Sequence, residues 1–130
     1  MFNTLTTCAP PKRRYLVLQP PEIDGITEHL AALSEPNRLR IFALLTRAEL
    51  CVCEITEELG LKQSLVSNHL RVLRRVGLVK ARRDDMDNRW VYYSLNRQTV
   101  ERLRSEFTAL TDLSHMDTEP ADCVGGKVRP

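Results

Sequence analysis

The chain has 130 residues, of which 42% are hydrophobic, and a formal net charge of +2, which suits one compact domain. No apolar run approaches the ~18 residues of a membrane span, and the N-terminus lacks the apolar stretch of a signal peptide, so we expect a cytoplasmic protein that does not bind membranes. In that reducing compartment the four cysteines are expected to be free thiols or metal ligands rather than disulfides.

Three helices are predicted in the first half of the chain. Residues 1–20 are punctuated by prolines and show no hydrophobic period, so we expect a flexible arm. A helix is expected over residues 21–33, and a second helix, capped by Asn37, follows it. A third, short helix is predicted over residues 52–59, where Gly60 provides the stop.

The clearest helical pattern lies in the segment LKQSLVSNHLRVLRRVG. Val66, Leu70 and Leu73 recur at positions i, i+4 and i+7, so they form one apolar stripe. Ser64 is the predicted N-cap, and Gly77 ends the helix.

A β-hairpin is predicted next, because the β-rich runs LVKARR and RWVYYSL flank the polar turn DDMDN. A last helix is expected over residues 97–113, where apolar residues again recur at helical spacing. Residues 114–130 are expected to be a disordered tail, which leaves residues 21–113 as the folded domain.

Charge is segregated along the chain. Residues 22–58 carry eight acids against three arginines, whereas residues 62–83 carry no acid. The basic residues of this second segment are Lys62, Arg71, Arg74, Arg75, Lys80, Arg82 and Arg83. Such a segment is typical of a surface that binds a polyanion, and a solvated helix face is the alternative on charge alone.

This order of elements, mostly α-helical with a β-hairpin, predicts a winged helix-turn-helix. The second helix of such a unit enters the DNA major groove, and the hairpin, or wing, lies on the backbone or in the minor groove. Short polar side chains can reach base edges, and arginines can hold phosphates. The candidate DNA-binding residues are Gln63, Ser64, Ser67, Asn68, Arg71 and Arg75 on the helix, and Arg82, Arg83 and Arg89 on the wing. A helical core with an incidental hairpin and a winged helix that binds protein are the alternatives.

A second candidate site is the pair Cys51 and Cys53, at the start of the third helix. Two neighbouring thiols are soft ligands for ions such as As(III), Sb(III), Cd(II), Pb(II), Cu(I) or Zn(II). The helix N-terminus is expected to lower the thiol pKa. In a regular helix residues i and i+2 diverge, so we expect the pair to need an extended or distorted first turn, and ion capture to strain or unwind the helix. Two half-buried small apolar residues are the alternative.

The segment ELCVCEI, followed by LGLKQSLVSNHLRVLRRVGLVKARRDDMDNRWVYYSL, resembles the ArsR/SmtB family of metal- and metalloid-responsive repressors, over roughly residues 26–113. The motif ELCVC is similar to the arsenic- and cadmium-sensing branches, whereas the second helix and the wing also resemble members that sense no metal. The resemblance implies a homodimer that binds operator double-stranded DNA and leaves it when As(III) or Sb(III) is captured. A repressor that responds to Cd(II), Pb(II) or Zn(II), and a regulator that senses no metal, are the alternatives.

The resemblance also bears on the third ligand of the ion. Many arsenic-sensing relatives carry a cysteine three residues after the second, but this chain has Thr56 there. Cadmium- and lead-sensing relatives recruit an N-terminal cysteine from the other subunit, so Cys8 is expected to complete the site; a free thiol is the alternative. Cys123 is a further candidate.

The resemblance implies three more expectations. The positions that match the family's interfacial zinc site are Arg97 and Thr99, which cannot ligate zinc, so we expect no zinc there. His29 and His115 are expected to be surface residues, and His69 to be structural or close to phosphate. The dimer core is predicted to contain Leu30, Leu33, Leu103, Phe107 and Leu110.

Because the sequence also lacks a catalytic triad, a phosphate-binding glycine loop and a βαβ setting for a redox dithiol, no enzyme activity is expected.

Overall fold

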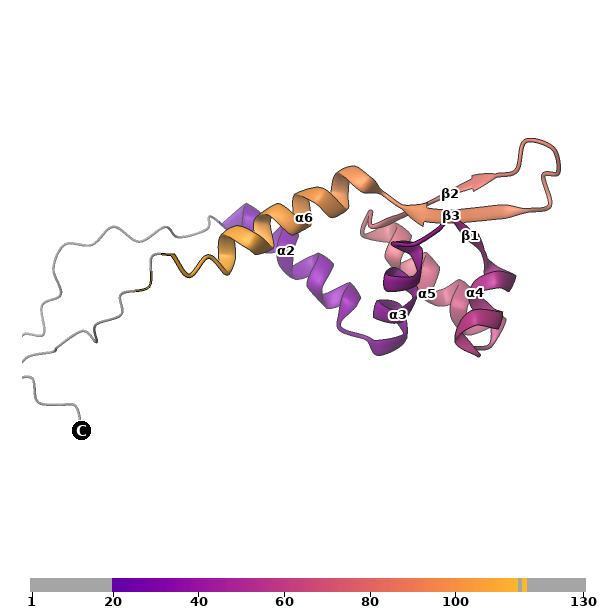
Figure 1. The fold of residues 1–130 in the computed structure, drawn as a ribbon, viewed down its shortest axis with the longest axis horizontal. Coiled ribbons are helices and arrows are strands. Elements are labelled where there is room, and N and C mark those ends of the chain that lie inside the picture. Colours follow the sequence, from indigo (N-terminus) through magenta and orange to yellow (C-terminus); the bar gives the residue numbers. More distant parts are fainter. Residues whose placement is uncertain (1–19, 115, 117–130) are drawn as a thin grey trace, which may run out of the picture. The chain divides into compact units, whose positions relative to one another are not determined.

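The computed structural model describes residues 20–114 and 116, so most of the predicted arm and tail, with Cys8, Cys123 and His115, lie outside the described residues. The described residues form five helices and a three-stranded sheet (Figure 1). In chain order these are α2 (Pro20–Leu33), α3 (Pro36–Leu45), β1 (Leu50–Cys51), α4 (Val52–Leu59), α5 (Gln63–Arg75), β2 (Val79–Arg83), β3 (Val91–Leu95) and α6 (Arg97–Leu110).

The predicted winged helix-turn-helix is confirmed. Helices α4 and α5 form the helix-turn-helix, and Gly60 between them has a left-handed φ of 65°, which glycine adopts without steric cost. Strands β2 and β3 form the antiparallel wing, in register from Val79 opposite Leu95 to Arg83 opposite Val91. Gly77, with φ of 80°, turns the chain from α5 into the wing.

The sheet contains a short strand that was not predicted. β1 pairs antiparallel with β3, so the strand order is β1-β3-β2. Leu50 lies opposite Tyr93, and Cys51 lies opposite Tyr92. A strand of two residues is too short to show an alternating pattern, so sequence periodicity could not reveal it.

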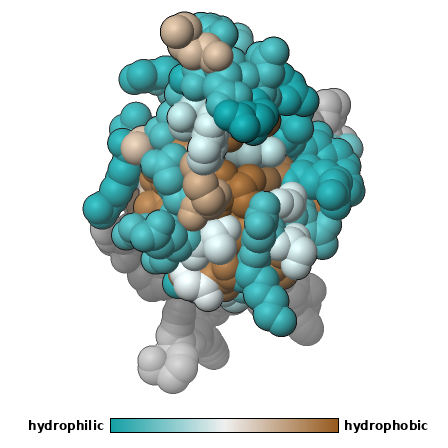
Figure 2. Space-filling view, turned by 90° about the vertical axis from the view of Figure 1, so that its right-hand side faces the viewer, coloured by the Kyte–Doolittle hydropathy of each residue, from teal (hydrophilic) through white to brown (hydrophobic). Residues whose placement is uncertain are grey.

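The protein core lies between α3, α4, α5, α6 and the base of the wing. The predicted stripe of α5 is confirmed, because Val66, Leu70 and Leu73 are fully buried. Burying each such side chain contributes roughly 1.5–3 kcal/mol. Figure 2 faces the end of the domain that bears the wing and α4, where hydrophobic atoms show through a ring of hydrophilic side chains. The stripe therefore fixes which side of α5 remains available to a partner.

Two predicted helix caps are wrong. Glu35, rather than Asn37, caps α3, since its side chain accepts a hydrogen bond of 2.8 Å from the backbone N–H of Arg38. Pro36 occupies the first turn, where its fixed φ suits the helix, so the cap lies two residues upstream of the predicted one. Helix α5 begins at Gln63, so Lys62 takes the cap position and Ser64 lies inside the first turn.

Two predictions about single side chains also need correction. His29 is not a surface residue: it is half-buried, and its Nε2–H donates a hydrogen bond of 2.9 Å to the carbonyl oxygen of Val76, which ties α2 to the end of α5. Leu103 is buried in the core of its own protomer and is therefore not free to form a dimer core, whereas Leu33 is only partly buried against that core. The last helix ends at Leu110, before the predicted residue 113.

Candidate functional site

The two thiols of the ELCVC motif lie together. Cys51 is the N-cap of α4 with an extended backbone (φ −87°, ψ 169°), and Cys53 stands in the first turn of the helix. Their sulfur atoms are 2.9 Å apart. The predicted extended conformation is confirmed for Cys51, which lies just outside the helix, so its side chain can meet that of Cys53. That ion capture strains or unwinds the helix stays a prediction.

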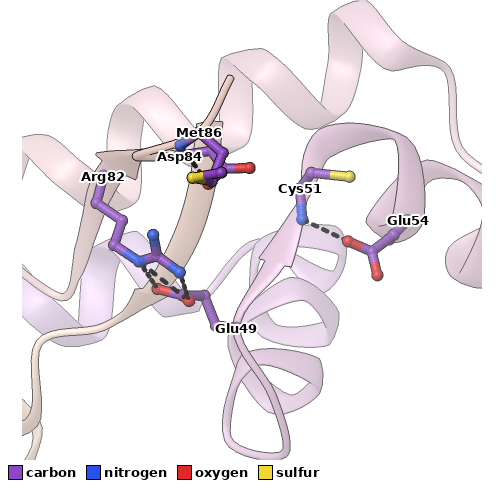
Figure 3. Close-up of polar contacts among 6 residues, drawn as sticks. All are labelled: Glu49, Cys51, Glu54, Arg82, Asp84 and Met86. Carbon is purple, nitrogen blue, oxygen red and sulfur yellow. Dashed lines mark hydrogen bonds and ion pairs between the residues drawn. The ribbon is translucent and has the colours of Figure 1, made fainter. Parts of the chain in front are cut away.

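The short strand and the helix cap hold Cys51 in this position. Its backbone pairs with Tyr92 of the wing, and its N–H donates a hydrogen bond of 3.0 Å to a carboxylate oxygen of Glu54 (Figure 3). The Cys51 sulfur in turn accepts from the Glu54 N–H, which completes a capping box. These hydrogen bonds hold the pKa of Glu54 below its usual value.

The ionisation of Cys51 differs from the sequence expectation. Burial of its side chain, followed by its hydrogen bond with Cys53, raises the pKa of the Cys51 thiol from 9.0 to about 11. Desolvation of the thiolate thus outweighs the favourable helix N-terminus. Cys51 is therefore a neutral thiol at physiological pH, and an ion that binds it must displace its proton.

The geometry fits two ligands of one thiophilic ion. Two sulfurs that share a tetrahedral zinc at ~2.3 Å lie ~3.8 Å apart, so a modest separation of the pair admits an ion. The Cys53 side chain is exposed, which leaves the site open to solvent. Thr56, at the position of the third cysteine of many relatives, donates its hydroxyl to the carbonyl oxygen of Val52 at 2.7 Å. Within residues 20–114 and 116 no three His, Cys, Asp or Glu side chains gather, so the described part of the site offers two thiols.

The predicted DNA-contacting residues of α5 stand on one side of that helix, away from its buried stripe. Gln63, Ser64, Asn68, Arg71 and Arg75 are exposed, and Ser67 is half-buried. Arg71 donates a hydrogen bond of 2.6 Å to the side-chain oxygen of Asn68, so these two side chains are already oriented together. The side of α5 opposite the core is thus polar and basic.

The three wing arginines each have a partner within the protein. Arg89 pairs with Asp87 at 2.8 Å, which lowers the pKa of that carboxyl, and Arg83 donates to the carbonyl oxygen of Asn88 at 2.9 Å. Arg82 reaches out of the hairpin and forms a bidentate ion pair with Glu49, before β1 (Figure 3). The structure therefore links the wing to the segment that carries the thiols.

Glu49 is a residue that the sequence did not single out. It stands two residues before Cys51, immediately before β1. That spacing was visible in the sequence, but the partner Arg82 could not be identified without the pairing of β1 with β3. Tyr92, which lies between Cys51 and Arg82 in the sheet, was missed for the same reason.

Comparisons with known proteins agree with this architecture. The family model described as "Bacterial regulatory protein, arsR family" matches residues 35–81. The chain is 43% identical over 81 residues to the transcriptional repressor SmtB homolog of Synechocystis sp., covering 62% of this chain and 59% of that relative. It is 37% identical over 76 residues to the arsenical resistance operon repressor of Bacillus subtilis, covering 58% of this chain and 70% of that protein.

A solved structure is similar as well. HlyU from Vibrio cholerae superposes with a TM-score of 0.58 at 30% identity, covering 72% of this chain and 98% of HlyU. The similarity therefore extends over the winged helix-turn-helix and its supporting helices.

Among the described residues, no helix is long and apolar enough to cross a membrane.

Proposed function

The chain belongs to the arsR family of bacterial regulatory proteins, and on that premise we propose that it is a metalloid-responsive transcriptional repressor. Proteins of this family are DNA-binding transcriptional regulators rather than enzymes, and they are generally dimeric. In our proposal the apo homodimer binds operator DNA in the cytoplasm. It dissociates when As(III) or Sb(III) is captured by Cys51 and Cys53, with Cys8 as the third thiolate.

The observation that carries this proposal is the thiol pair at the start of α4. The sulfurs are 2.9 Å apart, and one of them belongs to the residue that joins the wing to the helix-turn-helix. Helix α4 packs against α5, so a displacement of the pair can reach both DNA-contacting elements. A shift from 99% bound to 99% free needs about 5.5 kcal/mol of differential affinity, which bonds from several thiolates can supply.

The proposed DNA contacts follow from the exposed side of α5. Gln63, Ser64, Ser67 and Asn68 stand near the N-terminal end of that helix and read base edges in the major groove. Arg71 and Arg75 hold phosphates, and the wing brings Arg82, Arg83 and Arg89 towards the backbone or the minor groove. One α5 helix from each protomer serves each half-site.

The proposed dimer interface uses apolar side chains of α2 and α6, two helices that pack together. These side chains are exposed in the protomer although they are large and hydrophobic: Ile23, Leu30, Phe107 and Leu110. Covering them with a second copy removes apolar surface from water at roughly 25 cal/mol per Å². A homodimer is thus the state in which this surface is stable.

The test compares As(III) binding and release from promoter DNA for the wild type and for Cys8→Ser, Cys51→Ser and Cys123→Ser. We expect one As(III) per thiol site, no release by Cys51→Ser, and normal release by Cys123→Ser. Loss of release in Cys8→Ser shows that the arm supplies the third thiolate. If the wild type binds DNA but ignores As(III), the metalloid proposal is wrong, and titration with Cd(II) and Pb(II) decides whether a softer divalent ion is the inducer.

A further inference from the structure

The ion pair between Glu49 and Arg82 joins two functional parts of the domain. Arg82 Nη2 lies 2.6 Å from Glu49 Oε1, and Arg82 Nε lies 3.0 Å from Glu49 Oε2, so the contact is bidentate (Figure 3). The Arg82 side chain is 54% exposed and that of Glu49 is 33% exposed. Ion pairs this exposed contribute little to folding stability, but a bidentate pair fixes the direction of the guanidinium.

The sheet register places the same arginine in line with a thiol. Cys51 of β1 pairs with Tyr92 of β3, and Tyr92 pairs with Arg82 of β2. Directly paired residues direct their side chains to the same face of a sheet. The Arg82 guanidinium lies 5.2 Å from the centre of the Tyr92 ring, within the range of a cation–π contact. Backbone pairing and side-chain contacts thus run without a break from Cys51 to Arg82.

Glu49 connects the two ends of this row of paired residues. It precedes Cys51 by two residues and holds the arginine at the far end of the same row of paired residues. The other two wing arginines are engaged within the hairpin, by Asp87 and by the Asn88 carbonyl. Arg82 is therefore the wing arginine whose position depends on the segment that carries the thiols.

We propose that Glu49 is a positioning residue that couples the thiol pair to the wing: through its bidentate grip on Arg82 it transmits a displacement of Cys51 to the DNA-contacting hairpin. This role rests on the proposed function. The carboxylate of Glu49 thus adds a side-chain link between Arg82 and the segment that carries Cys51, beside the backbone pairing of the strands.

A displacement of Cys51 is built into the geometry of the pair. The sulfurs lie 2.9 Å apart in this structure, closer than two thiolates that share one ion, which on a tetrahedral zinc lie ~3.8 Å apart. Cys53 belongs to the first helical turn, but Cys51 is the cap and a member of β1. Any separation that Cys51 takes up is therefore passed directly to β3 and to Glu49.

The test uses Trp90, the single tryptophan of the chain, which lies in the wing and reports its movement without DNA. As(III) is titrated into the full-length wild type and into Glu49→Gln, Arg82→Gln, the double variant and a control, Glu57→Gln. Glu57 is an exposed carboxylate of α4, so the control removes the same charge from the same region. As(III) stoichiometry, Trp90 fluorescence and promoter-DNA affinity are measured for each.

We expect all five proteins to bind As(III) equally. In the wild type and in Glu57→Gln, As(III) changes the Trp90 fluorescence and lowers DNA affinity by about 100-fold, within the usual range of allosteric coupling. In Glu49→Gln and Arg82→Gln the fluorescence change is reduced and the drop in affinity falls below about tenfold, because the strand pairing alone transmits less of the displacement. The double variant adds little further, because both substitutions remove the same ion pair.

Two results overturn the proposal in distinguishable ways. If the wild type and Glu49→Gln both release DNA equally and show the same Trp90 response, Glu49 does not couple the sites, although the metalloid sensor stands. If the wild type binds no As(III), or keeps its DNA when As(III) is bound, the proposed function fails and the coupling fails with it.

Discussion

The thiol pair and the polar side of α5 place their functional side chains in different ways. The helical period alone determines the polar side, because its residues project from a helix whose other side is buried at Leu70 and its apolar neighbours. The thiol pair depends on a strand of two residues, whose partner β3 lies some forty residues later in the chain. The proposed DNA surface can therefore be built from local sequence, whereas the geometry of the proposed sensor needs the tertiary fold.

The buried stripe of α5 should be the part of the helix that determines stability. Replacing the buried Leu70 with alanine is expected to lower the free energy of unfolding by about 2–5 kcal/mol, because it removes packed atoms and leaves a cavity. Leu65 of the same helix is 36% exposed, so Leu65→Ala serves as the matched control. This control is expected to lower the free energy of unfolding by less than about 1 kcal/mol. Urea denaturation of both variants measures the difference, and equal losses would contradict the assignment of the two sides.

The thiol pair should determine the response to the inducer without determining DNA affinity. Cys51→Ser is expected to bind promoter DNA like the wild type, but to lose the As(III)-dependent drop in affinity of about 100-fold. Serine keeps the size and a capping oxygen at the start of α4, so the fold is retained. Fluorescence anisotropy with labelled DNA checks this. A variant that still leaves DNA at the wild-type As(III) concentration would exclude Cys51 as a ligand.

Burial of Cys51 should make stability depend on pH in a defined window. Its pKa is raised from 9.0 to about 11 in the folded protein, so the stabilisation is present below pH 9 and is lost as the pH rises through 11. Two pKa units correspond to roughly 3 kcal/mol. The measurement is the difference in unfolding free energy between wild type and Cys51→Ser from pH 7 to 11. A difference that stays constant across this range would show that the thiol is not desolvated.

The polar side of α5 should contribute to DNA affinity through its positive charge. Arg71→Gln is expected to weaken DNA binding severalfold at all sequences and to reduce the slope of log K against log salt by about 0.9, the effect of one lost phosphate contact. Arg104 is an exposed arginine of α6 outside the proposed DNA surface, so Arg104→Gln is the control and should leave the slope unchanged. Equal slopes for the two variants would place the DNA contact elsewhere.

Much of the fold followed from patterns in the sequence, for identifiable reasons. The stripe of α5 is a repeated signal, and the wing consists of two β-rich runs that flank a polar turn, so both elements and their order could be predicted. The cap of α3 was misplaced because Pro36, whose fixed φ suits the first turn, makes Glu35 the cap. The cap of α5 was misplaced because the helix begins at Gln63, with Lys62 at the cap position and no side-chain capping hydrogen bond there. Both errors shift a cap by two residues and leave the exposed side of α5 unchanged.

The thiol site was located by sequence, but its behaviour was not. The motif identified the two cysteines, whereas their convergence required the extended backbone of Cys51, which pairing with Tyr92 supports. The pKa of Cys51 was predicted with the wrong sign, since burial by the surrounding fold cannot be read from neighbouring residues. His29 was misjudged likewise, because its partner, the Val76 carbonyl, is distant in sequence.

The most direct test of the central claim is to count the sulfur ligands of bound As(III) by X-ray absorption spectroscopy, in the wild type and in Cys51→Ser and Cys53→Ser. If the pair holds the inducer, the wild type shows three As–S bonds, and each substitution removes one sulfur or abolishes binding. An unchanged sulfur count in either variant would show that As(III) binds elsewhere, and the thiol pair would then not be the sensor.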